Sequence, residues 1–353
     1  MLKQQSTDLL IRHIDAKALG DTGNNIEEFL RKLPGPTRIK ISGKESSRCR
    51  VLVTLLHGNE PSGLTALHQL LKQECVPAVD TFCYLIAIEA AMLKPLLSHR
   101  QVPGKRDYNR CFQPPFEIDD QGPVCERLLE EIRALNPEAV VDMHNTSGVG
   151  PSFGVTTSFD EKHDAIVSLF TDRLIVTDLR LGAIMETNTD AIPVVTIECG
   201  GVFEATADRI AFEGLQRFFT VRDLFSPESK DYGIELYFNP LRIEMHQATS
   251  LGYGNEPIGN CDITLKTDIE HHNFGLVTTD TLLGWVNPGA MDKLAAFDAE
   301  RTNHFKKLYR EENGCLYPRL NQKLFMITSN PEIARNDCLW YVVAEESAED
   351  SGR

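Results

Sequence analysis

Several polar side chains that directly follow apolar runs have the types and spacing needed to hold and use a catalytic metal. His57 and Glu60 follow the apolar run 51–56, and His144 follows the run 139–143. A catalytic zinc commonly takes two histidines and one carboxylate, and leaves a further position for water or substrate. We therefore predict that His57, Glu60 and His144 hold one Zn²⁺ per chain. The alternative is that either histidine is simply hydrogen-bonded in a loop, because a lone His-x-x-Glu is common.

Glu198 is the predicted catalytic base. It follows a third apolar run, 193–197, and precedes Gly200 and Gly201, where the backbone can pass close to a ligand. A zinc hydrolase needs a base that takes a proton from the attacking water and returns it to the leaving nitrogen. For this residue alone, a carboxylate that caps the following helix is an equally good interpretation.

A basic stretch between the first two runs contains candidates for substrate binding. It holds Arg100, Arg106, Asn109 and Arg110. The planar fork of an arginine matches a carboxylate, and a positive group can stabilise a developing oxyanion. The alternative is a solvated basic turn.

The elements that must position these residues are those of an α/β fold. Short β-branched runs alternate with segments of helical period, such as 124–135 and 163–174, over the first two-thirds of the chain. In open α/β sheets, ligand sites collect at the carboxyl ends of the strands, so the polar loops are expected to meet there. After about residue 226 the sequence is richer in Gly, Asn and Pro. We predict a catalytic α/β domain over 1–228 and a smaller β-rich domain over 229–353.

Four ordered motifs resemble the succinylglutamate desuccinylase and aspartoacylase family, a branch of the zinc carboxypeptidase-like fold. They are His57-Gly58-Asn59-Glu60, Asp107-Tyr108-Asn109-Arg110 with Phe112, Asp142-Met143-His144-Asn145-Thr146, and Ile197-Glu198 with Gly200.

The resemblance implies a mostly parallel or mixed sheet flanked by helices, with the C-terminal domain shaping the active-site entrance. It also implies that Asn109 and Arg110 bind the substrate carboxylate, and that an upstream arginine polarises the acyl carbonyl. Arg100 and Arg106 both lie off the family's usual offset from Asn109. We favour Arg100 as the catalytic arginine, because Arg106 directly abuts the matched segment and is assigned to substrate binding.

The expected function is hydrolysis of the amide bond in a small, anionic N-acyl amino acid. A zinc carboxypeptidase acting on short peptides would use the same metal site, so it remains an alternative. A metal-binding homologue without turnover is a third hypothesis, and the presence of Glu198 weighs against it. The acyl group and the amino acid stay open.

Charge and cysteine usage indicate the setting in which the chain works. The formal net charge of −15 repels nucleic acid and anionic lipid surfaces, so neither is an expected partner. No stretch reaches the roughly 18 apolar residues of a membrane span. The nine cysteines are scattered without a C-x-x-C pair, and the first twenty residues do not resemble a secretory signal. We expect a cytoplasmic protein, with a homo-oligomer left open.

Overall fold

The computed structural model describes residues 10–225, 231–298, 300–336 and 338–344. The chain divides into two compact units. The first contains the chain up to Asn145, Ser152–Val176 and Arg180–Leu236, and the second contains Thr146–Pro151, Thr177–Leu179 and the chain from Tyr237. The domain boundary expected at residue 228 lies outside the described residues.

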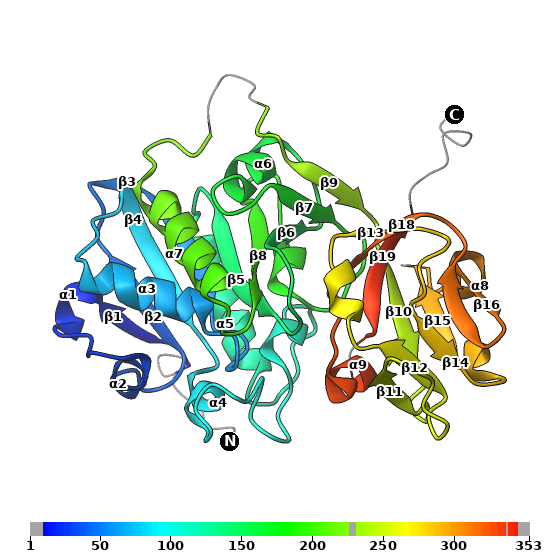
Figure 1. The fold of residues 1–353 in the computed structure, drawn as a ribbon. Helices are drawn as coiled ribbons and strands as arrows, with labels where there is room; N and C mark the ends of the chain where they lie inside the picture. The colour runs from blue at the N-terminus through cyan, green and yellow to red at the C-terminus, as the bar shows by residue number, and fades with distance from the viewer. Residues whose placement is uncertain (1–9, 226–230, 299, 337, 345–353) are drawn as a thin grey trace. The chain divides into compact units, whose positions relative to one another are not determined.

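A nine-stranded mixed sheet forms the centre of the first unit (Figure 1). Strand β3 is parallel to both of its neighbours, β4 and β5, whereas β6 is antiparallel to β8 and β2 is antiparallel to β4. The mixed sheet flanked by helices is the fold class expected from the sequence, which is confirmed. The strands, in their order across the sheet, are β1 (Arg12–Asp15), β2 (Thr37–Ile41), β4 (Val79–Leu85), β3 (Glu45–Thr54), β5 (Val140–Thr146), β8 (Val194–Gly201), β6 (Phe153–Thr156), β7 (Arg173–Val176) and β9 (Glu235–Phe238).

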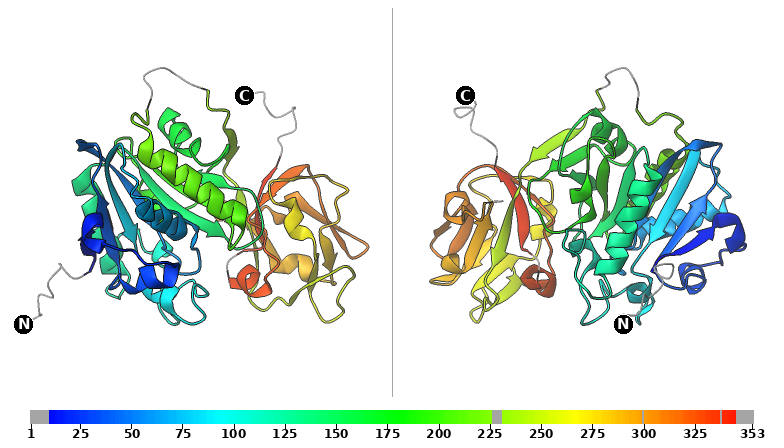
Figure 2. Two further views of the ribbon diagram at one scale, coloured as in Figure 1. Left: turned by 60° about the vertical axis from the view of Figure 1, so that its left-hand side comes forward. Right: turned by 180° about the vertical axis from the view of Figure 1, so that it is seen from behind.

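Helices cover both faces of this sheet. Helices α3 (Ser62–Lys72) and α7 (Ala205–Thr220) lie side by side on one face, and α5 (Gly122–Leu135) lies on the other, as the view from behind in Figure 2 shows. Successive side chains of a strand point to opposite faces. Leu52 of β3 accordingly packs in the core with α3 and α7, whereas Val51 and Val53 pack in the core with α5.

Shorter helices complete the first unit. The helix predicted over 124–135 is α5, but the helix predicted over 163–174 is wrong beyond Val167, because residues 173–176 form β7. The remaining helical segments are α1 (Ala16–Leu19), α2 (Ile26–Arg31), α4 (Ile88–Met92), α6 (Glu161–Val167) and the 3₁₀ turns η2 (Tyr108–Arg110) and η3 (Ile184–Thr187).

The second unit is built from two five-stranded sheets. Its core contains the fully buried Trp340, whose indole N–H donates to the hydroxyl of Tyr309 over 2.8 Å. One sheet has the order β13 (Leu276–Val277), β18 (Gln322–Phe325), β19 (Trp340–Ala344), β10 (Leu241–Met245) and β15 (Leu294–Phe297). The other has the order β11 (Leu251–Gly254), β12 (Ile263–Lys266), β14 (Gly284–Val286), β17 (Cys315–Pro318) and β16 (Tyr309–Glu312). Its helical segments are η4 (Ile269–His272), η5 (Ala290–Lys293), α8 (Phe305–Leu308) and α9 (Pro331–Asn336).

Two whole-chain expectations can be compared with the described residues. Among them, no helix combines the length and the apolar character needed to cross a membrane. All nine cysteines are free of disulfide bonds.

Candidate active site

The loop between β3 and α3 presents His57 and Glu60 from a tightly packed turn. Leu55 adopts a left-handed conformation directly after the strand, with φ of +57°. A Cβ atom at Gly58 would lie 2.5 Å from the backbone nitrogen of Ala91, so only glycine fits there. The N–H of Gly58 donates to the carbonyl of Arg100 over 2.9 Å. The loop is therefore held between α4 and the segment that carries Arg100.

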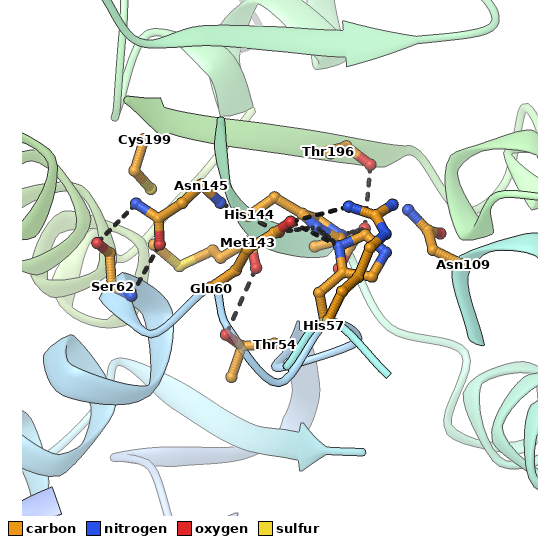
Figure 3. A network of polar contacts seen from close by, with 12 residues as sticks. Thr54, His57, Glu60, Ser62, Asn109, Met143, His144, Asn145, Thr196 and Cys199 are labelled. Carbon is orange, nitrogen blue, oxygen red and sulfur yellow. Dashed lines mark hydrogen bonds and ion pairs between the residues drawn. The ribbon is translucent and has the colours of Figure 1, made fainter. Parts of the chain in front are cut away.

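His57, Glu60 and His144 converge on one point, as Figure 3 shows. Glu60 bridges the two rings: its Oε1 lies 2.8 Å from His57 Nδ1, and its Oε2 lies 2.7 Å from His144 Nδ1. The two Nδ1 atoms are 3.1 Å apart. All three side chains are buried. The structure thus brings together the three residues predicted to bind the metal.

Each imidazole is oriented by a carboxylate on its far side. His57 Nε2 lies 2.9 Å from Asp107 Oδ1, and His144 Nε2 lies 2.8 Å from Asp142 Oδ2. The hydroxyl of Thr196 donates to the same oxygen of Asp142 over 3.1 Å. A carboxylate on Nε2 keeps the proton on that nitrogen, which directs the lone pair of Nδ1 toward the cluster.

The charges of this cluster suit a divalent cation. Burial opposes ionisation of Glu60, but the charges of His57 and His144 outweigh it and hold the pKa of Glu60 well below its usual range. Burial likewise opposes the charged form of His144, yet Asp142 and Glu60 raise its pKa well above the ordinary value. Without metal, these carboxylates therefore favour a proton on His144. A metal ion that displaces this proton would satisfy the same charges.

The donor set also fits zinc by geometry. Donor atoms around a tetrahedral zinc lie about 3.4 Å apart when the bonds are about 2.1 Å long. The ligand atoms here are all within 4.8 Å of one another, and the shortest separations are 2.7 to 3.1 Å. A small adjustment of side chains opens this cluster to the size of the ion. His57, Glu60 and His144 would hold the ion.

Glu198 lies on β8 with one carboxylate oxygen buried and unpartnered. Among the described residues, nothing forms a hydrogen bond with its Oε2. Burial raises the pKa of Glu198 to about 7, with an opposing effect from His144 and a further increase from Glu60. These interactions place the carboxyl group near His144 and Glu60. A carboxyl group with such a pKa can accept and return a proton near neutral pH.

Arg100 and Arg106 occupy different surroundings. The Nε of Arg100 donates to Asp107 over 3.0 Å, and its Nη1 donates to Glu60 over 3.2 Å. Arg106 instead donates from Nε to Asp119 over 2.5 Å. Asp119 in turn accepts from the first backbone N–H groups of α5, and the hydrogen bond from Arg106 lowers the pKa of Asp119 to about 2. Arg100 is thus at the cluster of His57, Glu60 and His144, whereas Arg106 is engaged with the start of α5.

Asn109 and Arg110 lie on η2, directly after Asp107. The side-chain oxygen of Asn109 accepts from the N–H of Ile184 over 3.1 Å, and Asn109 lies at the edge of the cluster in Figure 3. Nη1 of Arg110 donates to the carbonyl of Asn109 over 2.9 Å. Burial opposes ionisation of Asp107, but His57, Arg100 and Arg110 together hold its pKa well below the usual range. Arg110 is therefore close to the cluster as well.

Comparison with solved structures identifies the fold. The succinylglutamate desuccinylase from Chromobacterium violaceum aligns over 89% of this chain and 90% of its own, with 12% identity and a TM-score of 0.54. The succinylglutamate desuccinylase/aspartoacylase from Rhodobacter sphaeroides aligns over 88% of each chain, with 17% identity and a TM-score of 0.53. The chain has the succinylglutamate desuccinylase fold.

Murine aminoacylase 3 shares this desuccinylase fold, over 85% of this chain and 96% of its own, with 14% identity and a TM-score of 0.51. Comparison of the sequence with family models and with curated proteins finds no match. The likeness is therefore one of architecture, and it extends over both units of the chain.

The site also depends on two residues, Asn145 and Ser62, to which the sequence analysis assigned no role. The side-chain nitrogen of Asn145 donates to Ser62 Oγ over 2.8 Å and to the carbonyl of Gly200 over 3.1 Å. Its side-chain oxygen accepts from the N–H of Ser62 over 3.0 Å, and Ser62 Oγ donates to Asp208. Figure 3 shows Asn145 and Ser62 on the opposite side of the cluster from Asn109. Asn145 thereby joins the ends of β5 and β8 to the start of α3. Its place in the motif Asp142–Thr146, directly after His144, is the signal that the sequence holds for it.

Proposed function

We propose that this chain is a zinc-dependent hydrolase that cleaves the amide bond of a small N-acyl amino acid. The observation that carries the proposal is the combination of three convergent ligand atoms with a buried, unpartnered carboxylate oxygen on Glu198. The desuccinylase fold and the motifs around His57, Asn109, His144 and Glu198 support placing the chain in the succinylglutamate desuccinylase and aspartoacylase family. The related structures are desuccinylases and an aminoacylase by name.

Each of the candidate residues has a proposed role in hydrolysis of the amide bond. Zinc held by His57, Glu60 and His144 would supply a Lewis acid that activates water and polarises a carbonyl oxygen. Glu198 takes the proton from the attacking water and delivers it to the leaving nitrogen, which a carboxyl group with a pKa of about 7 can do in both directions. Arg100 lies beside Glu60 and is suited to stabilise negative charge that develops on the acyl oxygen.

Asn109 and Arg110 are proposed to bind the substrate carboxylate. The guanidinium of Arg110 offers a planar pair of donors for it, and Asn109 is fixed by its hydrogen bond to the backbone of Ile184. Because Arg106 is bonded to Asp119, its part in substrate binding would be indirect, through the segment between it and Asn109.

The test is a panel assay on the purified, zinc-loaded protein. N-succinyl, N-acetyl and N-formyl amino acids are incubated with it, and release of the free amino group is measured with and without a chelator. We expect chelator-sensitive release from at least one acyl class. Short peptides are included in the panel, and faster removal of their C-terminal residues would favour the carboxypeptidase alternative. No release from any compound would refute the proposal.

A further inference from the structure

The turn that follows the strand carrying Glu198 presents an exposed phenylalanine. Strand β8 ends at Gly201, and the N–H of Glu204 donates back to the carbonyl of Gly201 over 3.2 Å, which closes a turn with Val202 and Phe203 at its centre. The side chain of Phe203 is 69% exposed, among the largest exposures of any aromatic side chain that the structure describes.

The backbone of Phe203 is in a conformation that phenylalanine disfavours. The φ of Phe203 is +64°, which lies in the left-handed region, whereas the φ of Val202 is not positive. A left-handed residue at the third position is the mark of a type II turn, where glycine or asparagine is favoured. A bulky residue in this region is a backbone outlier that costs conformational energy, and such outliers cluster at functional sites. Neither burial nor backbone preference accounts for a phenylalanine here.

Phe203 follows a strand end that is hydrogen-bonded to the candidate active site. Gly200, three residues before it, is bonded through its carbonyl to Asn145, and the N–H of Asn145 lies 3.3 Å from Glu60 Oε2. Gly201 is fixed as well, because its N–H donates to the side chain of Glu204 over 3.0 Å. Three residues of extended chain span at most about 11 Å, so Phe203 lies within that distance of the strand end that Asn145 joins to the cluster.

The arginines beside the site indicate how many substrate carboxylates it can take. Arg100 is bonded to Asp107 and Glu60, and Arg106 is bonded to Asp119. Within the part of the chain that the structure describes, Arg110 is the arginine of the segment 100–110 that forms no ion pair with a carboxylate, and its Nη1 donates to the carbonyl of Asn109. This segment therefore offers one guanidinium, that of Arg110, for a substrate carboxylate. An acyl group with a second carboxylate would find no such partner in this segment.

We propose that the substrate carries a single carboxylate, bound by Arg110, and an uncharged, apolar acyl group that packs against Phe203. This inference rests on the proposed function and narrows its substrate class. The contact gives a reason for the exposed ring and for the strained turn, since an apolar acyl chain removes the ring from water only when substrate is bound.

The experiment compares two amides on zinc-loaded protein, N-phenylacetyl-L-alanine and N-succinyl-L-alanine. We expect the wild type to prefer the phenylacetyl compound in kcat/KM. Phe203→Ala and Phe203→Asn should each lower that preference by about tenfold, the effect of roughly one aromatic contact. Phe203→Asn should in addition raise the Tm by about 2 to 4 °C, because asparagine tolerates the left-handed conformation. The matched control is Phe159→Asn, which alters another exposed phenylalanine that has no positive φ.

A second readout separates this inference from the proposed function. Binding of phenylacetate and of succinate to the same zinc-loaded proteins is measured by calorimetry. Turnover with an unchanged preference in both Phe203 variants would overturn the role of Phe203 and leave the hydrolase proposal intact. No turnover, but weaker phenylacetate binding in these variants alone, would overturn the hydrolase proposal and support the contact. A wild type that prefers the succinyl compound would overturn the single-carboxylate substrate.

Discussion

Replacing Glu198 with glutamine separates proton transfer from metal binding. The amide keeps the shape of the side chain and removes the oxygen that accepts a proton. We expect kcat to fall by about two to four powers of ten, the usual contribution of a positioned acid or base. Zinc content should stay at the wild-type level, because Glu198 is outside the group of side chains whose ligand atoms converge.

The same substitution has a calculable effect on stability. Burial raises the pKa of Glu198 from 4.5 to about 7. A carboxyl group whose pKa is raised on folding binds its proton more tightly in the native state, so the metal-free protein loses stability as the pH rises from 4.5 to 7. The difference between the two pKa values corresponds to a loss of about 3 kcal/mol, complete above pH 7. Glutamine does not ionise, so the metal-free variant should escape this loss.

The assay is urea unfolding of both metal-free proteins at about pH 5 and about pH 8, beside kcat measured on the zinc-loaded forms. The free energy of unfolding of Glu198→Gln, relative to the wild type, should rise by about 2.5 kcal/mol between these pH values, because a small part of the loss in the wild type has already occurred at pH 5. Glu126→Gln, at an exposed position of α5, is the control and should show no such rise. Turnover near the wild-type rate would place the base elsewhere. A stability difference that does not change with pH would refute the account of the buried carboxylate.

Three further outcomes follow from the site. His57→Ala should lose zinc together with activity, since two ligands rarely hold the ion tightly, and full zinc content by atomic absorption would contradict the assigned ligand set. Arg110→Lys should lower kcat/KM by about one to two powers of ten on an acylated amino acid but much less on its carboxamide, because lysine keeps the charge and loses the planar fork. Equal losses on both compounds would mean that Arg110 does not bind the carboxylate. Chelation should abolish hydrolysis and added zinc should restore it, whereas activity that survives dialysis against chelator would rule out a metal-dependent reaction.

The convergence of His57, Glu60 and His144 could be predicted because each of these residues follows an apolar run. Strands β3, β5 and β8 are consecutive in the sheet, so the ends that carry His57, His144 and Glu198 are neighbours in space. The sequence indicates the strands and their ends. The order of the strands across the sheet cannot be read from one sequence. The expectation that the three residues meet came from the rule that ligand sites gather at the carboxyl ends of strands.

The partners of long side chains could not be predicted in the same way. Arg100 and Arg106 differ by six positions, and the distinction between them depends on Asp119, which also accepts from the first N–H groups of α5. Likewise, the period of residues 163–174 fits a helix. The segment Arg173–Val176 nevertheless forms strand β7, because it pairs with β6 in the sheet. Such features are decided by tertiary contacts, which override local preference.

The second unit shows a similar limit of local patterns. It takes in Thr146–Pro151 and Thr177–Leu179, two short segments from the middle of the catalytic part of the chain. A change of composition along the chain can mark where a domain begins. It does not show that segments from earlier in the chain belong to that domain as well. The left-handed turn at Phe203 could not be predicted from the sequence either, because phenylalanine is not one of the residues typical of such turns.

The carboxylates around His57 and His144 also determine the order in which zinc and substrate can bind. Four carboxyl groups, those of Glu60, Asp107, Asp142 and Glu198, lie at the cluster, and Arg100 and Arg110 are permanent cations beside it. An anionic acyl amino acid that enters before the metal meets charges of its own sign, and the net charge of −15 adds to the repulsion. Addition should therefore be ordered, with zinc preceding substrate. Calorimetric titration of an N-acyl amino acid into metal-free protein should show no saturable heat, and saturable binding there would disprove the order.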